Sequence, residues 1–124
     1  MNREGFERLV ARTVDSLPEE FRTRLENIDV VAQDWPTQDQ LNSTGLRRGH
    51  TLLGLYEGVP LTKRSQHYGL VLPDKITILQ KPIEARCKGE TELTAEIQRI
   101  VRHEIAHHFG IGDARLKQLE SGED

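Results

Sequence analysis

The chain has few residues of several kinds, and each shortage argues against a class of protein. It contains a single cysteine, Cys87, so no disulfide can form within it and a disulfide-stapled secreted scaffold is excluded. Its longest apolar runs are a few residues, far short of the roughly 20 that a membrane-spanning helix needs. The first residues, MNREGFERLV, are charged and amphipathic where a signal peptide carries an unbroken apolar stretch. We therefore expect a cytoplasmic protein with no membrane partner.

A strong excess of either charge is also missing. The chain has 17 Lys and Arg against 20 Asp and Glu, a formal net charge of -3 at pH 7. Proteins that bind phosphate backbones usually present a basic face, and the basic pairs Arg47-Arg48 and Lys63-Arg64 are too short to form one. We expect no nucleic-acid partner. With 35% hydrophobic and 30% charged residues, the 124 residues suit one domain, residues 1–124.

What the chain does have is the stretch HEIAHHFGIGD at residues 103–113. An α-helix turns about 100° per residue, so His103 and His107 lie one turn apart on the same face, where two imidazoles can reach one metal ion. Glu104 lies about a quarter-turn to the side, near enough to act on a water at that metal without displacing it. One helical turn thus supplies two candidate metal ligands and a candidate base.

A catalytic zinc usually takes three protein ligands, and Asp113 is the candidate for the third. On a continuing helix, Asp113 would lie about 9 Å beyond His107 and about 240° around it, facing away. Gly110 removes this difficulty, because glycine accepts the left-handed conformation that ends helices and lets the chain fold back. The complete pattern is His-Glu-x-x-His-x-x-Gly-x-x-Asp. His108, about 140° around the helix from His103, is interpreted as a core-edge or hydrogen-bonding residue.

The motif is expected at the end of a long helix over residues 91–109. Apolar residues recur there at spacings of three and four and form one stripe that would pack on the rest of the domain: Leu93, Ile97, Ile100, Val101 and Ile105. Thr91 or Thr94 is the expected N-terminal cap. This register predicts that His103 and His107 lie beside the stripe and are partly buried.

The remaining chain is predicted to complete an α+β domain, a small sheet packed on helices beside the long active-site helix. A first helix buries a face that includes Phe6, Leu9 and Leu17. Ser16, Pro18 and Glu19 resemble a capped start of a second helix that ends near Asn27. The other predicted segments are a buried strand at 28–32, a long loop at 33–50, a strand at 51–56, a loop at 60–74 and a strand at 75–80.

The motif residues make the chain resemble the zincin-like metallopeptidases, and in particular a small single-domain bacterial family of minimal zincins. The segments LLGLYEGVPLTKR and LPDKITILQKPI extend this resemblance over most of the chain. It implies a sheet beside the active-site helix, with zinc between that helix and a returning loop. The chain departs from the metzincins, because Met1 is the only methionine and no Met-turn can lie beneath the metal.

The resemblance also implies an activity. One Zn²⁺ per chain would be held by His103, His107 and Asp113, and Glu104 would act as general base in the hydrolysis of a peptide bond. The substrate would be a peptide or an exposed protein segment, laid along an edge strand provisionally placed at residues 51–56.

Other interpretations of the sequence stay open. An oxyanion donor is expected, with His67, Tyr68 and Tyr56 as the only candidates, each better interpreted as a surface or core residue. The chain could instead be a non-catalytic interaction module that keeps zinc for folding. A metal-dependent ribonuclease is a third interpretation, since one bacterial endoribonuclease family has a similar helical His-x-x-x-His site, but Glu104 and the acidic net charge argue against it. The sequence does not determine the oligomeric state or the substrate.

Overall fold

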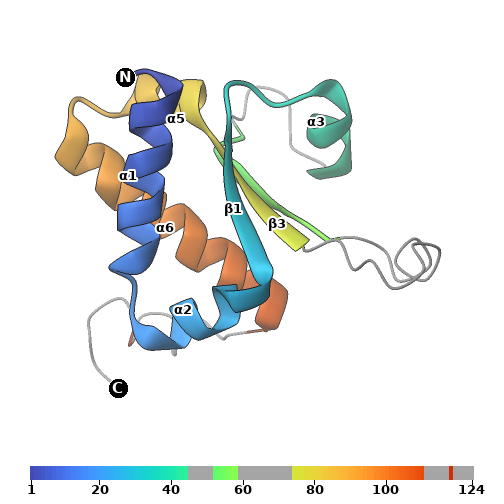
Figure 1. Cartoon of the computed structure of the whole chain (residues 1–124). Coiled ribbons are helices and arrows are strands. Elements are labelled where there is room, and N and C mark those ends of the chain that lie inside the picture. Colours follow the sequence, from blue (N-terminus) through green and yellow to red (C-terminus); the bar gives the residue numbers. More distant parts are fainter. Residues whose placement is uncertain (45–51, 59–73, 111–117, 119–124) are drawn as a thin grey trace.

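The computed structural model describes residues 1–44, 52–58, 74–110 and 118, and its mixture of helices and strands confirms the α+β prediction (Figure 1). Among the described helices, none is both long and apolar enough to cross a membrane. In chain order the elements are α1 (Arg3–Asp15), α2 (Glu19–Arg24), the 3₁₀ helix η1 (Leu25–Asn27), β1 (Ile28–Gln33), α3 (Gln38–Thr44), β2 (Gly54–Glu57), β3 (Asp74–Leu79), α5 (Gln80–Arg86) and α6 (Glu90–Phe109).

The described strands form a sheet in the order β1-β3-β2, with β3 in the middle. β1 runs parallel to β3, with Ile28 opposite Asp74, and β2 runs antiparallel to it, with Gly54 opposite Ile78. All three predicted strands are therefore present. The expectation that the first of them is a buried strand is wrong: β1 lies at an edge of the described sheet, and of its residues only Ile28 is buried.

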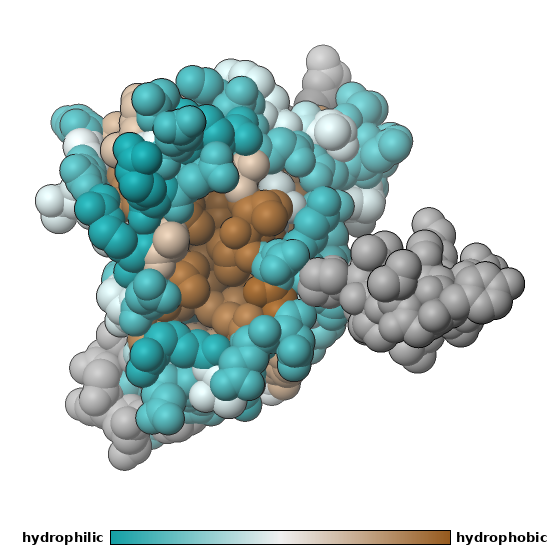
Figure 2. Space-filling model, viewed as in Figure 1, coloured by the Kyte–Doolittle hydropathy of each residue, from teal (hydrophilic) through white to brown (hydrophobic). Residues whose placement is uncertain are grey.

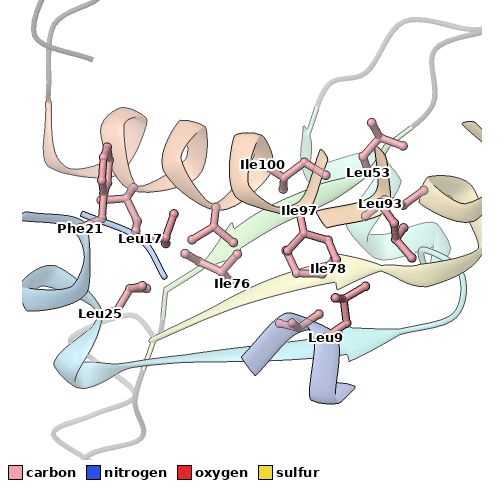
Figure 3. Close-up of a cluster of buried hydrophobic side chains, with 14 of the residues drawn as sticks. Leu9, Leu17, Phe21, Leu25, Leu53, Ile76, Ile78, Leu93, Ile97 and Ile100 are labelled. Atoms are coloured by element: carbon pink, nitrogen blue, oxygen red, sulfur yellow. The ribbon is translucent and has the colours of Figure 1, made fainter. Parts of the chain in front are cut away.

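Different helices cover the two faces of the sheet. Side chains alternate along β3, so its residues contribute to a separate hydrophobic cluster on each face. Ile76 and Ile78 face the main core, which joins residues of α1, α2, α5 and α6 (Figure 3). Leu79 points to the other face, where it belongs to a small cluster with Leu55 and Leu41 of α3. In Figure 1 the strands accordingly run between α1 and α6 on one side and α3 on the other.

The long helix agrees with its prediction. α6 spans Glu90–Phe109, and its buried side chains include all five residues of the predicted apolar stripe. Its N-terminal cap differs from the prediction, because the capping position is Gly89 and no side chain caps the helix there. Thr91 and Thr94 both lie within the helix instead.

The start of the second helix was predicted wrongly. Ser16 is the C-cap of α1: its backbone N–H donates to carbonyls of the last turn, and its hydroxyl donates to the Thr13 carbonyl. α2 then begins at Glu19 without a side-chain cap. Ser16 lies between the end of α1 and the start of α2. Its hydroxyl bonds to the end of α1 and does not cap α2.

Two short helices were not predicted. α3 lies within the predicted loop at 33–50, and α5 begins at the end of the strand predicted at 75–80. α3 starts with a reciprocal capping box in which Thr37 Oγ1 accepts from the Gln40 N–H and Gln40 Oε1 accepts from the Thr37 N–H. α5 follows β3 directly, with Pro82 in its first turn, where a missing N–H costs nothing. The predicted loop at 60–74 lies almost wholly outside the described residues.

α6 and the sheet approach each other closely at Gly54 of β2. A Cβ atom built on Gly54 would lie 2.5 Å from Ile100 Cγ2 and 3.1 Å from the Thr77 carbonyl oxygen, so a side chain here requires the Ile100 side chain or the backbone to shift. This contact places the middle of α6 directly beside β2.

We expect Gly54→Ala to lower the free energy of unfolding by about 1 to 3 kcal/mol, the usual cost of overpacking a rigid contact. Gly89→Ala is the matched control, because a Cβ there meets no atom within 4 Å and the backbone is extended. Urea unfolding of both variants measures the difference. An equal decrease in the free energy of unfolding for both variants would mean that Ile100 and its neighbours adjust to a methyl group at position 54 at no cost.

Candidate metal site and active-site cavity

The candidate site lies on the last two turns of α6, where the helical spacing places His103 and His107 on one side. Their ring centroids are 6.2 Å apart and the rings are tilted by 56°. The helix ends at Gly110, which adopts the left-handed conformation with φ 68° and donates its N–H to the Ala106 carbonyl. The predicted helix end at Gly110 is therefore confirmed.

A cavity of about 760 Å³ runs between α6 and β2, and all three described motif side chains line it. Its walls come from the end of α3, from β2 with the two residues before it, and from one side of α6. The lining residues are Ser43, Thr44, Leu52, Leu53, Gly54, Leu55, Tyr56, Arg99, Ile100, His103, Glu104, His107 and His108.

The expectation that the two histidines are partly buried is wrong, since His103 and His107 are both exposed. The apolar stripe of α6 turns toward the sheet and buries residues such as Ile105. The histidines flank this stripe and face the open cavity instead of the core. An exposed position leaves their ring nitrogens accessible to a ligand from solution.

Glu104 is in a different environment from the histidines because it is half-buried. Burial raises the pKa of its carboxyl group above the ordinary value, and the neighbouring His103 and His107 oppose part of that rise. A carboxylate with a raised pKa takes up a proton more readily, which is the property required of a general base.

The donor atoms present suit zinc, which binds imidazole nitrogen and carboxylate oxygen. Two imidazoles on one tetrahedral zinc have ring centroids roughly 5 Å apart, given metal–nitrogen bonds of about 2 Å. The 6.2 Å between His103 and His107 differs from this by an amount that side-chain rotation can supply. Within the described residues no three His, Cys, Asp or Glu side chains come together to hold a metal, and Asp113 lies outside those residues.

The candidate oxyanion donors separate in the structure. Tyr56 lines the cavity, but its hydroxyl donates to Asp74 Oδ2 at 2.7 Å and its ring stacks on His108 with centroids 3.8 Å apart. His108 also contacts the edge of Phe109. These contacts give both rings a role in joining β2 to the end of α6. His67 and Tyr68 lie outside the described residues.

Arg99 is a lining residue that the sequence interpretation missed. It lies four residues before His103, so the same helical spacing that pairs the histidines would have placed it on the cavity side. Its guanidinium donates to Glu96 and holds the pKa of that carboxyl below its ordinary value. Ser43 and Thr44 carried no comparable signal, because they reach the cavity from a helix far away in sequence.

Comparison with known proteins identifies the family of the chain. The sequence profile of the zincin-like metallopeptidases matches residues 25–123, and the chain belongs to that family. A solved structure, a conserved hypothetical protein from Thermus thermophilus, is similar to it at 25% sequence identity with a TM-score of 0.55. The similarity covers 88% of this chain and 94% of the other. No curated protein matches the chain.

We expect His108 and His107 to differ when each is replaced by alanine in metal-free protein. His108→Ala removes the stack on Tyr56 and should lower the free energy of unfolding by about 0.5 to 1 kcal/mol, the lower part of the range for aromatic pairs, since His108 is exposed. His107→Ala should stay within about 0.5 kcal/mol of wild type. Urea unfolding in the presence of a chelator measures both free energies. His108→Phe, which keeps an aromatic ring for the stack, should retain the stability that His108→Ala loses. Equal effects of the two alanine variants would contradict a structural role for His108.

Proposed function

We propose that this protein is a zinc-dependent peptidase that hydrolyses peptide bonds, with Glu104 as general base. The observation that carries the proposal is that His103, Glu104 and His107 all line one cavity beside the edge strand β2. Membership of the zincin-like metallopeptidases supports the same reaction class.

His103 and His107 are the proposed imidazole ligands of one zinc ion per chain, and Asp113 is the proposed third ligand. When bound, zinc supplies Lewis-acid chemistry, polarising the substrate carbonyl and making a water molecule more acidic. The two histidines come from one rigid helix whose buried stripe fixes its position, so they need little reorganisation to bind the metal.

Glu104 is proposed to move the proton. Its carboxylate would accept a proton from the attacking water and deliver it to the leaving amine. Half-burial and a raised pKa suit both transfers, because the group must bind the proton firmly enough to accept it and still release it. Its position on the wall of the cavity gives it access to a substrate.

β2 is the proposed docking strand for the substrate. It lies at the edge of the described sheet, so its outer backbone groups face away from β3. A peptide added along this edge would place its backbone next to the cavity, and the apolar side chains of Leu52 and Leu55 would offer contacts to its side chains.

The metal prediction separates roles within the motif. We expect one zinc per chain in wild type and in Glu104→Gln, and weaker binding by about 10-fold or more in alanine variants of His103, His107 and Asp113. His108→Ala is the matched control on the same helical turn and should keep its zinc. Elemental analysis and zinc titration provide the measurement. Zinc loss from Glu104→Gln equal to that of the ligand variants would make Glu104 a ligand and overturn its role as base.

The activity prediction tests the reaction itself. Glu104→Gln should lower peptide hydrolysis by at least about 10²-fold while keeping zinc and fold, because it removes the base and preserves the shape. Glu92→Gln is the control, since Glu92 is exposed near the other end of α6. Digestion of a broad peptide mixture at high enzyme concentration, followed by mass spectrometry, measures the rates. A wild type that cleaves nothing but captures a protein in a zinc-dependent way would favour an interaction module instead.

A further inference from the structure

A second hollow lies on the opposite edge of the sheet from the candidate active site. It has a volume of about 420 Å³ and lies between α1 and β1, and it takes in every residue from Ile28 to Ala32 of the strand. Figure 2 shows a hydrophobic hollow between α1 and β1, surrounded by hydrophilic residues. We call it the α1–β1 groove.

The groove follows the edge strand β1 along its length. It touches five consecutive residues, whose side chains alternate between the two faces of the sheet, so the backbone of the strand forms part of its wall. Among the described strands, none pairs with β1 on the side away from β3. The groove therefore combines an apolar floor with an unpaired strand edge.

The backbone of β1 points into this groove. The Leu79 N–H donates to the Leu53 carbonyl on the β2 side, so the backbone groups of the alternate residue Ile78 point toward β1. In the parallel register Ile78 lies opposite Ala32 and bonds to the residues that flank it, so the Ala32 carbonyl points away from β3. That carbonyl accepts a hydrogen bond of 3.0 Å from Arg3 of α1.

Backbone groups of alternate residues point to the same edge of a strand, so those of Val30 and Ile28 point the same way as the Ala32 carbonyl. Arg3 meets this edge at Ala32, and among the described residues no hydrogen bond occupies the Val30 N–H and C=O on that side, so both can pair with an added segment.

The charges on the groove define what kind of segment it fits. Its lining residues are apolar except for the carboxylates of Glu7, Asp15 and Asp29. The basic side chain of Arg3 meets one end of the groove at Ala32, where it is paired with Asp34. Within residues 1–44, 52–58 and 74–110, none of these three carboxylates takes part in an ion pair. An acidic rim around an apolar floor attracts a segment that carries both apolar and basic side chains.

We infer that the α1–β1 groove binds an extended segment of a partner protein in which apolar and basic side chains alternate, added to the sheet along β1. Five residues of β1 span about 16 Å, which matches an extended segment of about five residues. Apolar side chains on the segment face toward α1 would fill the floor, whose margin carries Glu7 and Asp15. Basic side chains on the other face would meet Asp29, which points away from the core face that Ile28 and Val30 share. The candidate active site lies two strand spacings away, about 9 to 10 Å across the sheet, so both edges can be occupied together.

The test uses the full chain and a synthetic heptapeptide of alternating lysine and valine, with a second peptide that has glutamate in place of lysine. In ¹⁵N–¹H spectra, the lysine peptide should shift the amide signals of residues 28–32 in a saturable way and bind about tenfold tighter than the glutamate peptide. Two further versions, N-methylated on one or the other backbone edge, should differ, because strand pairing uses only one edge.

Protein variants test the rim. Asp29→Lys should weaken binding of the lysine peptide about fivefold, and Asp39→Lys, an equal change of charge on α3 outside the groove, should leave it unchanged. If Asp29→Lys unfolds, Asp15→Lys at the end of α1 makes the same test.

Three results would overturn the inference. Shifts confined to Gly54, His103 and their neighbours would assign the peptide to the active-site cavity. Equal binding of both N-methylated peptides would exclude strand addition. Concentration-dependent shifts at residues 28–32 without peptide, together with a dimer in sedimentation, would assign the groove to a second copy of this chain.

Discussion

The close packing of α6 on the sheet is the constraint on which the other features of the structure depend. Glycine at position 54 lets β2 approach Ile100 so closely that a Cβ atom there would lie 2.5 Å from Ile100 Cγ2. The apolar stripe of α6 then faces Ile76 and Ile78 across the main core. Because the helix is held in this register, the residues that flank its stripe must emerge beside β2, and the cavity between helix and strand forms there.

A sheet with one central strand leaves two edges, and in this protein the edges differ in chemistry. At β2 the neighbouring helix offers imidazoles, a half-buried carboxylate and Arg99. At β1 the neighbouring helix offers apolar side chains and carboxylates. Both edges have backbone groups free of β3, so both suit extended segments, and the side chains around each edge determine which segments fit.

The tertiary contacts also reassign residues that belong to no motif. The sequence suggested a core-edge or hydrogen-bonding role for His108, and for Tyr56 either an oxyanion donor or a surface or core residue. In the structure the two rings stack on each other. The hydrogen bond from the Tyr56 hydroxyl to Asp74 ties this pair to β3. The end of α6 is thus attached to the sheet at a second point, two turns after Ile100. His107 lies between the two attachments, on the side that faces the cavity.

The sequence by itself determined the features that depend on neighbours a few residues apart. The spacing of His103, Glu104 and His107, the stripe of α6 and the end at Gly110 all follow from helical geometry, and the three strands follow from short β-branched and apolar runs. The helices α3 and α5 were missed because seven residues carry little periodicity, although the Thr37 and Gln40 capping box marks α3.

Only the tertiary structure decided which strands are edges, that the histidines are exposed, and that Ser43 and Thr44 join the cavity wall. These properties depend on contacts between residues far apart in the chain, and no local pattern records them. Two assignments stay predictions from the sequence: Asp113 as a metal ligand, and residues 1–124 as one domain. Local geometry sets which groups a helix presents, and long-range packing sets what those groups face.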